Sequence, residues 1–223
     1  MASLDSIMKP RSIAVVGAST KPNTIGSDLL KRLIEYGFTG KIYPVNPKGG
    51  VIEGLTAYPS VLDIPGDVDL AIIVVKNTFV LSTIDQCHEK GITGLVVISA
   101  GFKETDEAGA ALEKELAAKV KAYGMRCVGP NCLGVVNTDP AVRMDGCFAE
   151  SLPQRGDIGF VSQSGALGGG ILNILKDLNI GFSQFISIGN QADVNAETAI
   201  EYWENVDDVR QILLYICLLY TSP

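Results

Sequence analysis

The chain has no surplus of positive charge, because its 18 Lys and Arg residues are outnumbered by 25 Asp and Glu residues, which gives a net charge of -7. A protein that binds nucleic acid nonspecifically needs such a surplus to neutralise phosphates. The composition therefore argues against a nucleic-acid partner. It still allows a small anionic ligand, because backbone amides and one or two lysines are enough to bind a single phosphate group.

Long apolar runs are missing as well. No stretch approaches the roughly 20 residues of a membrane-spanning helix, and the N-terminus has no signal-peptide core. We therefore expect a cytoplasmic protein without a membrane segment. Cysteine is sparse and lacks C-x-x-C spacing, which predicts a reduced protein with no metal site. The five cysteines are Cys87, Cys127, Cys132, Cys147 and Cys217.

Several common catalytic motifs are also absent. No Gly-rich loop continues into G-K-[ST], which argues against a Walker loop, and no serine lies in a G-x-S-x-G elbow of the hydrolase type. Histidine occurs once, as His88, on a predicted helix face that leans toward the surface. We therefore do not expect His88 to carry a phosphoryl group.

Short runs rich in Val and Ile alternate along the chain with amphipathic helical patterns. Continuous apolar strands flanked by helices are typical of a parallel sheet that is covered on both faces. Several helices are expected to end where glycine supplies a left-handed cap, at Gly37, Gly91 and Gly124. The predicted fold class is α/β, with two doubly wound units. The expected strands lie at 12–16, 41–45, 69–75, 94–99, 126–129, 157–162, 181–188 and 210–216.

The alternation breaks between residues 137 and 156, where prolines and glycine-bounded turns predict an interdomain connection. We therefore expect a first domain at residues 1–138, a linker at residues 139–155 and a second, partial domain at residues 156–216. Only three strands of the second domain are visible in the sequence.

The last seven residues, 217–223, fit neither a helix nor a loop of this fold. We expect them to be non-native sequence, of the kind left by translated adapter read-through at the end of a fragment, and the natural protein to continue beyond Ile216. The alternative is an ordinary apolar C-terminal strand.

Ligands of such sheets bind at the carboxyl ends of the strands. The first strand is followed by Gly17, Ala18 and Ser19, a tight small-residue turn that does not match G-x-G-x-x-G. The second strand ends in "NPK", where NAD-binding proteins usually place a carboxylate. Lys48 favours a phosphate instead, as in NADP or coenzyme A. The alternatives are a small-residue turn without a ligand and a solvated turn lysine.

Two further strand ends carry polar or small residues. The fourth strand is followed by Ser99, Ala100 and Gly101, and the fifth by "GPNC". Cys132 is a candidate nucleophile by residue type, but no histidine lies near it in sequence. Asn131 is expected to orient a backbone or ligand carbonyl.

The second unit contains a sharper pattern, "GFVSQSGALGGG", in which a strand runs directly into a helix. Ser162, Ser164 and Gly165 supply two hydroxyls and free amides at the helix N-terminus, which predicts a phosphate site. The alternative is a serine-rich helix cap. Two loops of this type on consecutive units indicate phosphate chemistry more strongly than either loop alone.

The motifs "VVGAS", "YPVNPK", "DLAIIVV", "ISAGF", "GPNCLG", "VSQSGALGGG" and "SIGNQADV" follow one another in an order that resembles the NDP-forming acyl-CoA synthetases. This group contains ADP-forming acetyl-CoA synthetase, and the α-subunit of succinyl-CoA synthetase is more distantly similar. The resemblance extends from about Ser12 to Ile216. It implies a Rossmann-like CoA-binding domain followed by a partial flavodoxin-like domain, both with parallel sheets.

The resemblance also implies a reaction. Acyl-CoA, ADP and phosphate would give a small carboxylic acid, CoA and ATP, through an acyl phosphate and a phosphohistidine. ADP, ATP and Mg would bind a missing ATP-grasp domain or β-subunit, and we expect an oligomer.

By position, the resemblance places Gly17, Ala18, Ser19 and Lys48 along the CoA nucleotide. It places Ser99, Ala100 and Gly101 along the pantetheine arm, with Asn131 and Cys132 nearer the thiol. The transferring phosphate would bind at Ser162, Ser164 and Gly165.

The chain departs from the family pattern at the phosphohistidine, because no S-H-T-G segment is present. The family's L-Y-I-E strand also becomes "LYI" followed by Cys217. No catalytic residue is therefore expected in this fragment, and the fragment alone is expected to be inactive.

Two other functions stay open. One is a non-catalytic CoA- or acyl-CoA-sensing module, including the regulatory half of a fused protein acetyltransferase. The other is an NAD(P) oxidoreductase, which "NPK" disfavours.

Overall fold

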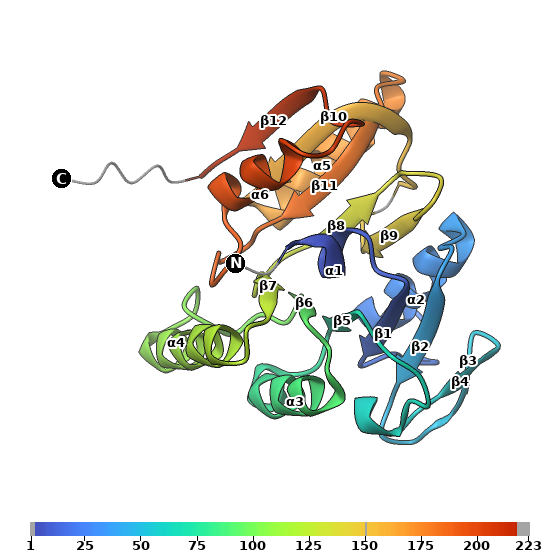
Figure 1. Cartoon of the computed structure of the whole chain (residues 1–223), viewed down its shortest axis with the longest axis vertical. Helices are drawn as coiled ribbons and strands as arrows, with labels where there is room; N and C mark the ends of the chain where they lie inside the picture. Colours follow the sequence, from blue (N-terminus) through green and yellow to red (C-terminus); the bar gives the residue numbers. More distant parts are fainter. Residues whose placement is uncertain (1–2, 150, 218–223) are drawn as a thin grey trace.

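The computed structural model describes residues 3–149 and 151–217. Of the tail expected to be non-native, residues 218–223 lie outside the described residues. The described part of the chain contains two five-stranded sheets with helices packed around them (Figure 1). None of its helices is long and apolar enough to cross a membrane.

The first sheet is parallel throughout, as expected for apolar strands separated by helices. Residues of β1 alternate between two apolar clusters, with Ile13 and Val15 in one and Ala14 and Val16 in the other. Both faces of this sheet are therefore buried. Its strands, in spatial order, are β2 (Lys41–Val45), β1 (Ser12–Val16), β5 (Leu70–Ile73), β6 (Gly94–Val97) and β7 (Arg126–Val128).

Helices cover the two faces of the first sheet from opposite sides (Figure 1). The helices α3 (Asn77–Lys90) and α4 (Glu107–Ala122) pack on one face, and α1 (Asp5–Met8) and α2 (Ile25–Tyr36) pack on the other. Helices α2 and α3 end at glycines in the left-handed conformation, as predicted. A small hairpin of β3 (Gly50–Ile52) and β4 (Leu55–Ala57) and the 3-10 helix η1 (Val61–Asp63) follow β2, and neither was predicted from the sequence.

The three strands that the sequence predicts for the second unit are parallel, as expected, but they belong to a larger, mixed sheet. Its strands β10, β11 and β12 are parallel, but β8 runs antiparallel to β11 and β9 runs antiparallel to β8. Antiparallel neighbours need only a short turn between them, and residues 138–143 provide it. The strands in spatial order are β12 (Gln211–Tyr215), β10 (Arg155–Ser162), β11 (Phe182–Ser187), β8 (Gly134–Asn137) and β9 (Met144–Cys147).

Strands β8 and β9 come from segments that were assigned to the end of the first domain and to the linker. The domain boundaries themselves remain a prediction, but this part of the chain joins the second sheet. The helices α5 (Gly165–Asp177) and α6 (Ala196–Trp203) pack on this sheet. Leu172 of α5 contacts the cluster of Phe160 and Phe185, whereas Ala199 of α6 belongs to the cluster shared with the first sheet.

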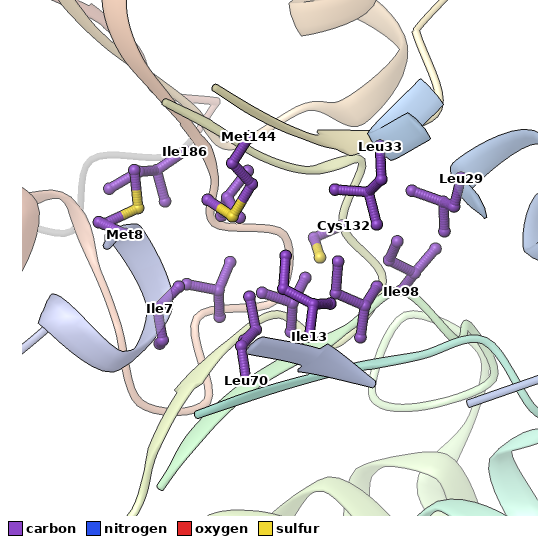
Figure 2. Close-up of a cluster of buried hydrophobic side chains, with 14 of the residues drawn as sticks. Ile7, Met8, Ile13, Leu29, Leu33, Leu70, Ile98, Cys132, Met144 and Ile186 are labelled. Atoms are coloured by element: carbon purple, nitrogen blue, oxygen red, sulfur yellow. The ribbon is translucent and has the colours of Figure 1, made fainter. Parts of the chain in front are cut away.

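One hydrophobic cluster joins the two sheets (Figure 2). Ile7 and Met8 come from α1 and Leu33 from α2, and all three are fully buried. Met144 of β9 and Ile186 of β11 meet them from the second sheet. Burying a side chain of this size contributes about 1.5–3 kcal/mol, so the interface stabilises both sheets and does not act as a hinge between independent cores.

A buried ion pair lies in the same interface. Arg32 of α2 and Asp145 of β9 are joined by an Nη2–Oδ2 distance of 2.7 Å, and their side chains are 11% and 0% exposed. Arg32 also donates a hydrogen bond to the carbonyl of Ser151. Burial raises the pKa of Asp145 to about 6, although Arg32 acts in the opposite direction.

We expect Arg32→Met to lower the free energy of unfolding by about 3–5 kcal/mol, because it leaves the Asp145 carboxylate buried without its cation. Urea denaturation at about pH 8 measures this loss. Arg155→Met is the matched control, because Arg155 pairs with Asp208 at an exposed position and surface pairs contribute less than about 1 kcal/mol. Equal losses of stability in both variants would contradict the conclusion that burial makes the Arg32–Asp145 pair the more important one.

The same pair predicts a pH dependence. Because the folded-state pKa of Asp145 is raised, its protonated form stabilises the fold at low pH, and this contribution is lost as the pH rises through about 6. Removing Arg32 takes away the cation that lowers the pKa of Asp145, so this carboxyl should protonate above pH 6 in Arg32→Met, and the cost of the substitution should shrink as the pH falls from about 8 toward 6. A cost that does not change with pH would argue against a charged Asp145 as its cause.

Candidate functional site

The predicted ligand residues of the first domain lie along one edge of its sheet. Lys48 follows β2, Gly17–Ser19 follow β1, Ser99–Gly101 follow β6, and Asn131–Cys132 follow β7. Because the sheet is parallel, these strand ends are all carboxyl ends and share an edge. The order β2-β1-β5-β6-β7 therefore arranges the groups in a row, with Lys48 at one end and Cys132 at the other.

The turn after β1 depends on close backbone packing. Gly17 has a φ of +100°, a conformation that side chains other than glycine disfavour. A Cβ added to Gly17 would lie 2.9 Å from Cγ2 of Val74, and one added to Gly26 would lie 2.1 Å from the Gly17 carbonyl oxygen. The first turn of α2 therefore packs directly on this turn, which explains why small residues occur here.

Asn46 connects the ends of β1 and β2. Its Nδ2 atom donates a hydrogen bond of 2.7 Å to the Ala18 carbonyl, and its Oδ1 atom accepts one of 2.9 Å from the Lys48 amide. The amide side chain therefore fixes both predicted nucleotide-binding turns relative to each other. The Lys48 residue is exposed at this edge.

The loop Ser99–Gly101, which we call the pantetheine loop after the part of the ligand that is predicted to contact it, is bonded to the chain that follows β5. Ser99 is buried, and its hydroxyl donates a 2.5 Å hydrogen bond to the Val75 carbonyl. Asn77 donates a 2.6 Å hydrogen bond to the Gly101 carbonyl. The Ser99 proton is therefore used to hold the loop, so this hydroxyl can contact a ligand only as a hydrogen-bond acceptor.

A pocket of about 560 Å³ lies where the first sheet edge meets the second unit. It brings Asn131 and Cys132 together with Ser164 and Gly165, so the predicted thiol end and the predicted phosphate site share one cavity. We call this the central pocket. Its lining residues are Asn131, Cys132, Leu133, Phe148, Gln163, Ser164, Gly165, Ala166, Gly189, Asn190 and Cys217.

Residues 162–165, which we call the phosphate loop after the ligand predicted there, lead into helix α5. Ser164 is the N-cap, and its hydroxyl accepts a 3.3 Å hydrogen bond from the Leu167 amide. The amides of Gly165 and Ala166 belong to the first turn, whose N–H groups have no partner within a helix. Both residues line the central pocket. This end of α5 therefore offers two amide donors and a positive helix dipole to an anion.

Ser162 has a different position from the one the sequence suggested. It is fully buried at the end of β10, and its hydroxyl donates a 2.7 Å hydrogen bond to the Ser164 carbonyl. A Cβ added to Gly168 would lie 3.0 Å from this hydroxyl oxygen. Ser162 therefore stabilises the loop through its hydrogen bond to Ser164, while Ser164 and Gly165 line the pocket.

The thiol of Cys132 is poorly suited to nucleophilic attack. It is 5% exposed and donates to the Val97 carbonyl at 3.3 Å. Burial raises the pKa of Cys132 to about 12, so the thiolate is scarce at neutral pH. The geometry agrees with the low weight that the sequence gave to catalysis by this residue.

His88 lies in the last turn of α3, at the opposite edge of the sheet from the ligand residues, because α3 begins after the end of β5 and leads back to the start of β6. The residue is exposed, and its ring stacks on Tyr123 with centroids 4.0 Å apart. Asp85, which is hydrogen-bonded to Tyr123, lies on the same helix. This position supports a surface role for His88.

Three polar residues at the site were not singled out from the sequence. Asn77 follows β5, Glu104 follows the pantetheine loop, and Asn190 follows β11. Asn77 and Asn190 each come within a few residues of a buried strand's carboxyl end, and this position alone could have identified them. The role of Glu104 depends on a contact with Asn190, 86 residues away, which no local pattern reveals.

No group of three or more His, Cys, Asp or Glu side chains within residues 3–149 and 151–217 is placed to hold a metal ion.

Two family models match the chain. The CoA binding domain matches residues 11–138, and the succinyl-CoA ligase like flavodoxin domain matches residues 155–217. Among the curated relatives, the acetate–CoA ligase [ADP-forming] II subunit alpha of Pyrococcus furiosus is 46% identical over 213 residues, which are 96% of this chain and 46% of the relative. The 4-hydroxybutyrate–CoA ligase [ADP-forming] of Nitrosopumilus maritimus is 40% identical over 94% of this chain and 30% of the relative.

A solved structure is also similar to this chain. The dinucleotide forming acetyl-coenzyme A synthetase 1 of Ca. Korarchaeum cryptofilum, in complex with phosphate and ADP, superposes with a TM-score of 0.94 at 39% identity. The match covers 99% of this chain and 47% of that one. These similarities confirm the resemblance to the NDP-forming acyl-CoA synthetases. The chain spans less than half of the length of these relatives.

We expect the buried Cys132 to resist alkylation in the folded protein, because its thiol is both enclosed and protonated. Iodoacetamide at about pH 8, followed by peptide mass spectrometry, should label the exposed Cys217 first and Cys132 only after unfolding. Cys217→Ser serves as the control and should leave the folded protein nearly unlabelled. Rapid labelling of Cys132 would show that its thiol is activated.

Proposed function

Because the chain belongs to the CoA binding domain family, we propose that it is the CoA-binding portion of an NDP-forming acyl-CoA synthetase. In this proposal the complete enzyme converts acyl-CoA, ADP and phosphate to a carboxylic acid, CoA and ATP, through an acyl phosphate and a phosphohistidine. The observation that carries the proposal is the central pocket, where Asn131 and Cys132 face the N-terminus of α5. A thioester carbonyl and a phosphate need such a shared space in order to react.

Coenzyme A would lie along the carboxyl edge of the first sheet. Lys48 would contact a phosphate of the nucleotide, and the turn Gly17–Ser19 would follow the adenosine end. The pantetheine arm would pass the loop Ser99–Gly101 and place its thiol near Asn131. The order of the strands supports this path, because it arranges these groups in the same sequence as the parts of the ligand.

Inorganic phosphate would bind at the first turn of α5, between the Gly165 and Ala166 amides and the Ser164 cap. A helix N-terminus stabilises an anion by about 0.3–1 kcal/mol, and by up to about 2 kcal/mol where the site is partly buried. Phosphoryl transfer needs mainly positioning and charge stabilisation, both of which this turn supplies. The residues of this chain would therefore hold the phosphate beside the thioester.

The rest of the relay would come from outside this chain. We propose that an ATP-grasp domain or β-subunit binds ADP, ATP and Mg, and that the phosphohistidine is not His88. The exposed position of His88 at the far edge of the sheet supports this division. We also propose an oligomeric enzyme of the cytoplasm.

The alternatives are less favoured. The relatives that cover nearly all of this chain are CoA ligases, which does not favour a purely sensing CoA module. For an NAD(P) oxidoreductase, the position after β2 holds Asn46, whose side chain is already used to hydrogen-bond Ala18 and Lys48. A carboxylate for ribose hydroxyls is therefore missing where such enzymes usually carry one.

Isothermal titration calorimetry should show that this chain binds CoA in preference to NAD. Lys48→Glu should weaken CoA binding by roughly 1–2 kcal/mol, and more at low salt, because a phosphate contact is replaced by repulsion. Lys114→Glu is the matched control, because it makes the same change in net charge on the exposed side of α4. Tighter binding of NAD, or equal effects of the two variants, would overturn the proposed CoA path.

A phosphate titration of three proteins tests the phosphate loop. Ser164→Asp should weaken phosphate binding roughly tenfold or more, about 1.4 kcal/mol, because a carboxylate would face the anion. Ser164→Asn should bind nearly as wild type, since Asn, like Asp, is a good helix N-cap without the charge. Unchanged binding in Ser164→Asp would exclude this helix end as the site.

A further inference from the structure

Glu104 lies between the pantetheine loop and the central pocket. One oxygen of its carboxylate, Oε1, accepts hydrogen bonds from the amides of Gly101, at 2.6 Å, and Phe102, at 3.1 Å. The other, Oε2, accepts a 2.6 Å hydrogen bond from Nδ2 of Asn190. A single side chain therefore contacts the first unit's loop and a residue of the second unit that lines the pocket.

The orientation of Asn190 follows from its neighbours. Its Nδ2 atom also donates a 2.8 Å hydrogen bond to Oε2 of Glu113. Because carboxylates only accept hydrogen bonds, the amide nitrogen must face these two acidic groups. The Oδ1 atom of Asn190 then faces Asn131, whose Nδ2 atom donates to it at 3.3 Å.

The backbone around Asn190 strengthens the same connection. The Asn190 amide donates to the Pro130 carbonyl at 2.9 Å, and the Ala192 amide donates to the Gly129 carbonyl at 3.0 Å. The loop after β11 is therefore bonded along the turn that carries Asn131. A displacement of Asn190 would move the thiol end of the proposed CoA path.

The two carboxylates next to Asn190 have a nearby cation. Lys103 pairs with Oε1 of Glu113 at 2.9 Å and also donates to the Asn190 carbonyl. Desolvation alone would raise the pKa of Glu104, but the hydrogen bonds from Asn190, Phe102 and Gly101 outweigh it and hold that pKa below its usual range. Glu104 is therefore ionised at neutral pH, as its three donors require.

We propose that Glu104 is a positioning residue that holds the pantetheine loop and the central pocket in one arrangement, so that the arm of CoA enters the pocket in register with the phosphate loop. This inference rests on the proposed function. Glu104 does not touch the reacting atoms; it acts through Gly101 on one side and through Asn190 on the other.

The chemistry explains why a carboxylate is needed. Glu104 accepts hydrogen bonds on both oxygens at once. In Glu104→Gln one oxygen becomes an NH₂ group, which would face either the Gly101 amide or the Asn190 amide group, donor against donor. The substitution keeps the size of the side chain and removes one of the two connections.

The test compares two ligands that differ in the 4′-phosphopantetheine group, which is the arm together with its own phosphate. CoA contains this group, whereas adenosine 3′,5′-bisphosphate carries the nucleotide end without it. Glu104→Gln should bind CoA roughly five- to tenfold more weakly than wild type, because a charge-assisted hydrogen bond is lost. Its affinity for adenosine 3′,5′-bisphosphate should not change, because Lys48 and the turn Gly17–Ser19 are intact.

Glu107→Gln is the matched control, since Glu107 is an exposed acid in the first turn of α4 and should leave both affinities unchanged. Asn190→Ala provides a second variant, which keeps the bonds of Glu104 to the pantetheine loop and should also weaken CoA selectively. Hydrogen exchange adds an independent measurement, because the amides of Gly101 and Phe102 should lose protection in Glu104→Gln.

The possible results distinguish a failure of the proposed CoA-binding function from a failure of the positioning role of Glu104. If wild type binds neither ligand, the proposed function fails. If wild type binds both, but Glu104→Gln and Asn190→Ala weaken both ligands equally or neither ligand at all, the positioning role is wrong and the CoA site stands. Selective loss of CoA affinity in both variants, with unchanged binding in Glu107→Gln, supports the inference.

Discussion

The hydrophobic contact between the two sheets is the interaction on which the rest of the molecule depends. Helices α1 and α2 each bury one face between the sheets, where Ile7, Met8 and Leu33 meet Met144 and Ile186. This packing fixes the carboxyl edge of the first sheet relative to the start of α5. The central pocket exists only because these two edges are held together. The site is therefore a product of the shared core as much as of the loops that line it.

Polar contacts surround this apolar interface and set its register. The pair of Arg32 and Asp145 is buried within it. A second ion pair joins the last strand of the first sheet to the chain after β11: Arg126 of β7 pairs with Asp193 at 2.9 Å. The Asp193 carboxylate also accepts a hydrogen bond from the Cys127 amide. Apolar packing alone tolerates small shifts between surfaces, whereas hydrogen-bonded charges require a defined geometry. The combination gives the two sheets one preferred arrangement.

Many of the strands and helix ends could be predicted from the sequence. The spacing of apolar residues and the positions of glycines are set within a few residues of each element, so they can be recognised without knowledge of the folded chain. The strand Ser12–Val16 and the cap at Gly37 are examples. Strand β9, "MDGC", was missed because Asp145 occupies a core position, where its pairing with Arg32 makes a buried carboxylate tolerable. The buried role of Ser162 was missed for a similar reason, since its hydroxyl is used by a carbonyl two residues away. Contacts of this kind depend on the folded chain and leave no periodic pattern.

The row of strand ends has a consequence for distance. Neighbouring strands are about 4.8 Å apart, so the four steps from β2 to β7 amount to roughly 19 Å. The backbone hydrogen bonds between the strands of the first sheet set this distance, and side-chain substitutions do not alter it. In the proposed CoA path, this spacing sets the distance between the end of the ligand at Lys48 and the end near Asn131. Changes in the loops could alter which ligand is held, but only the gain or loss of a whole strand would change the span between the two ends.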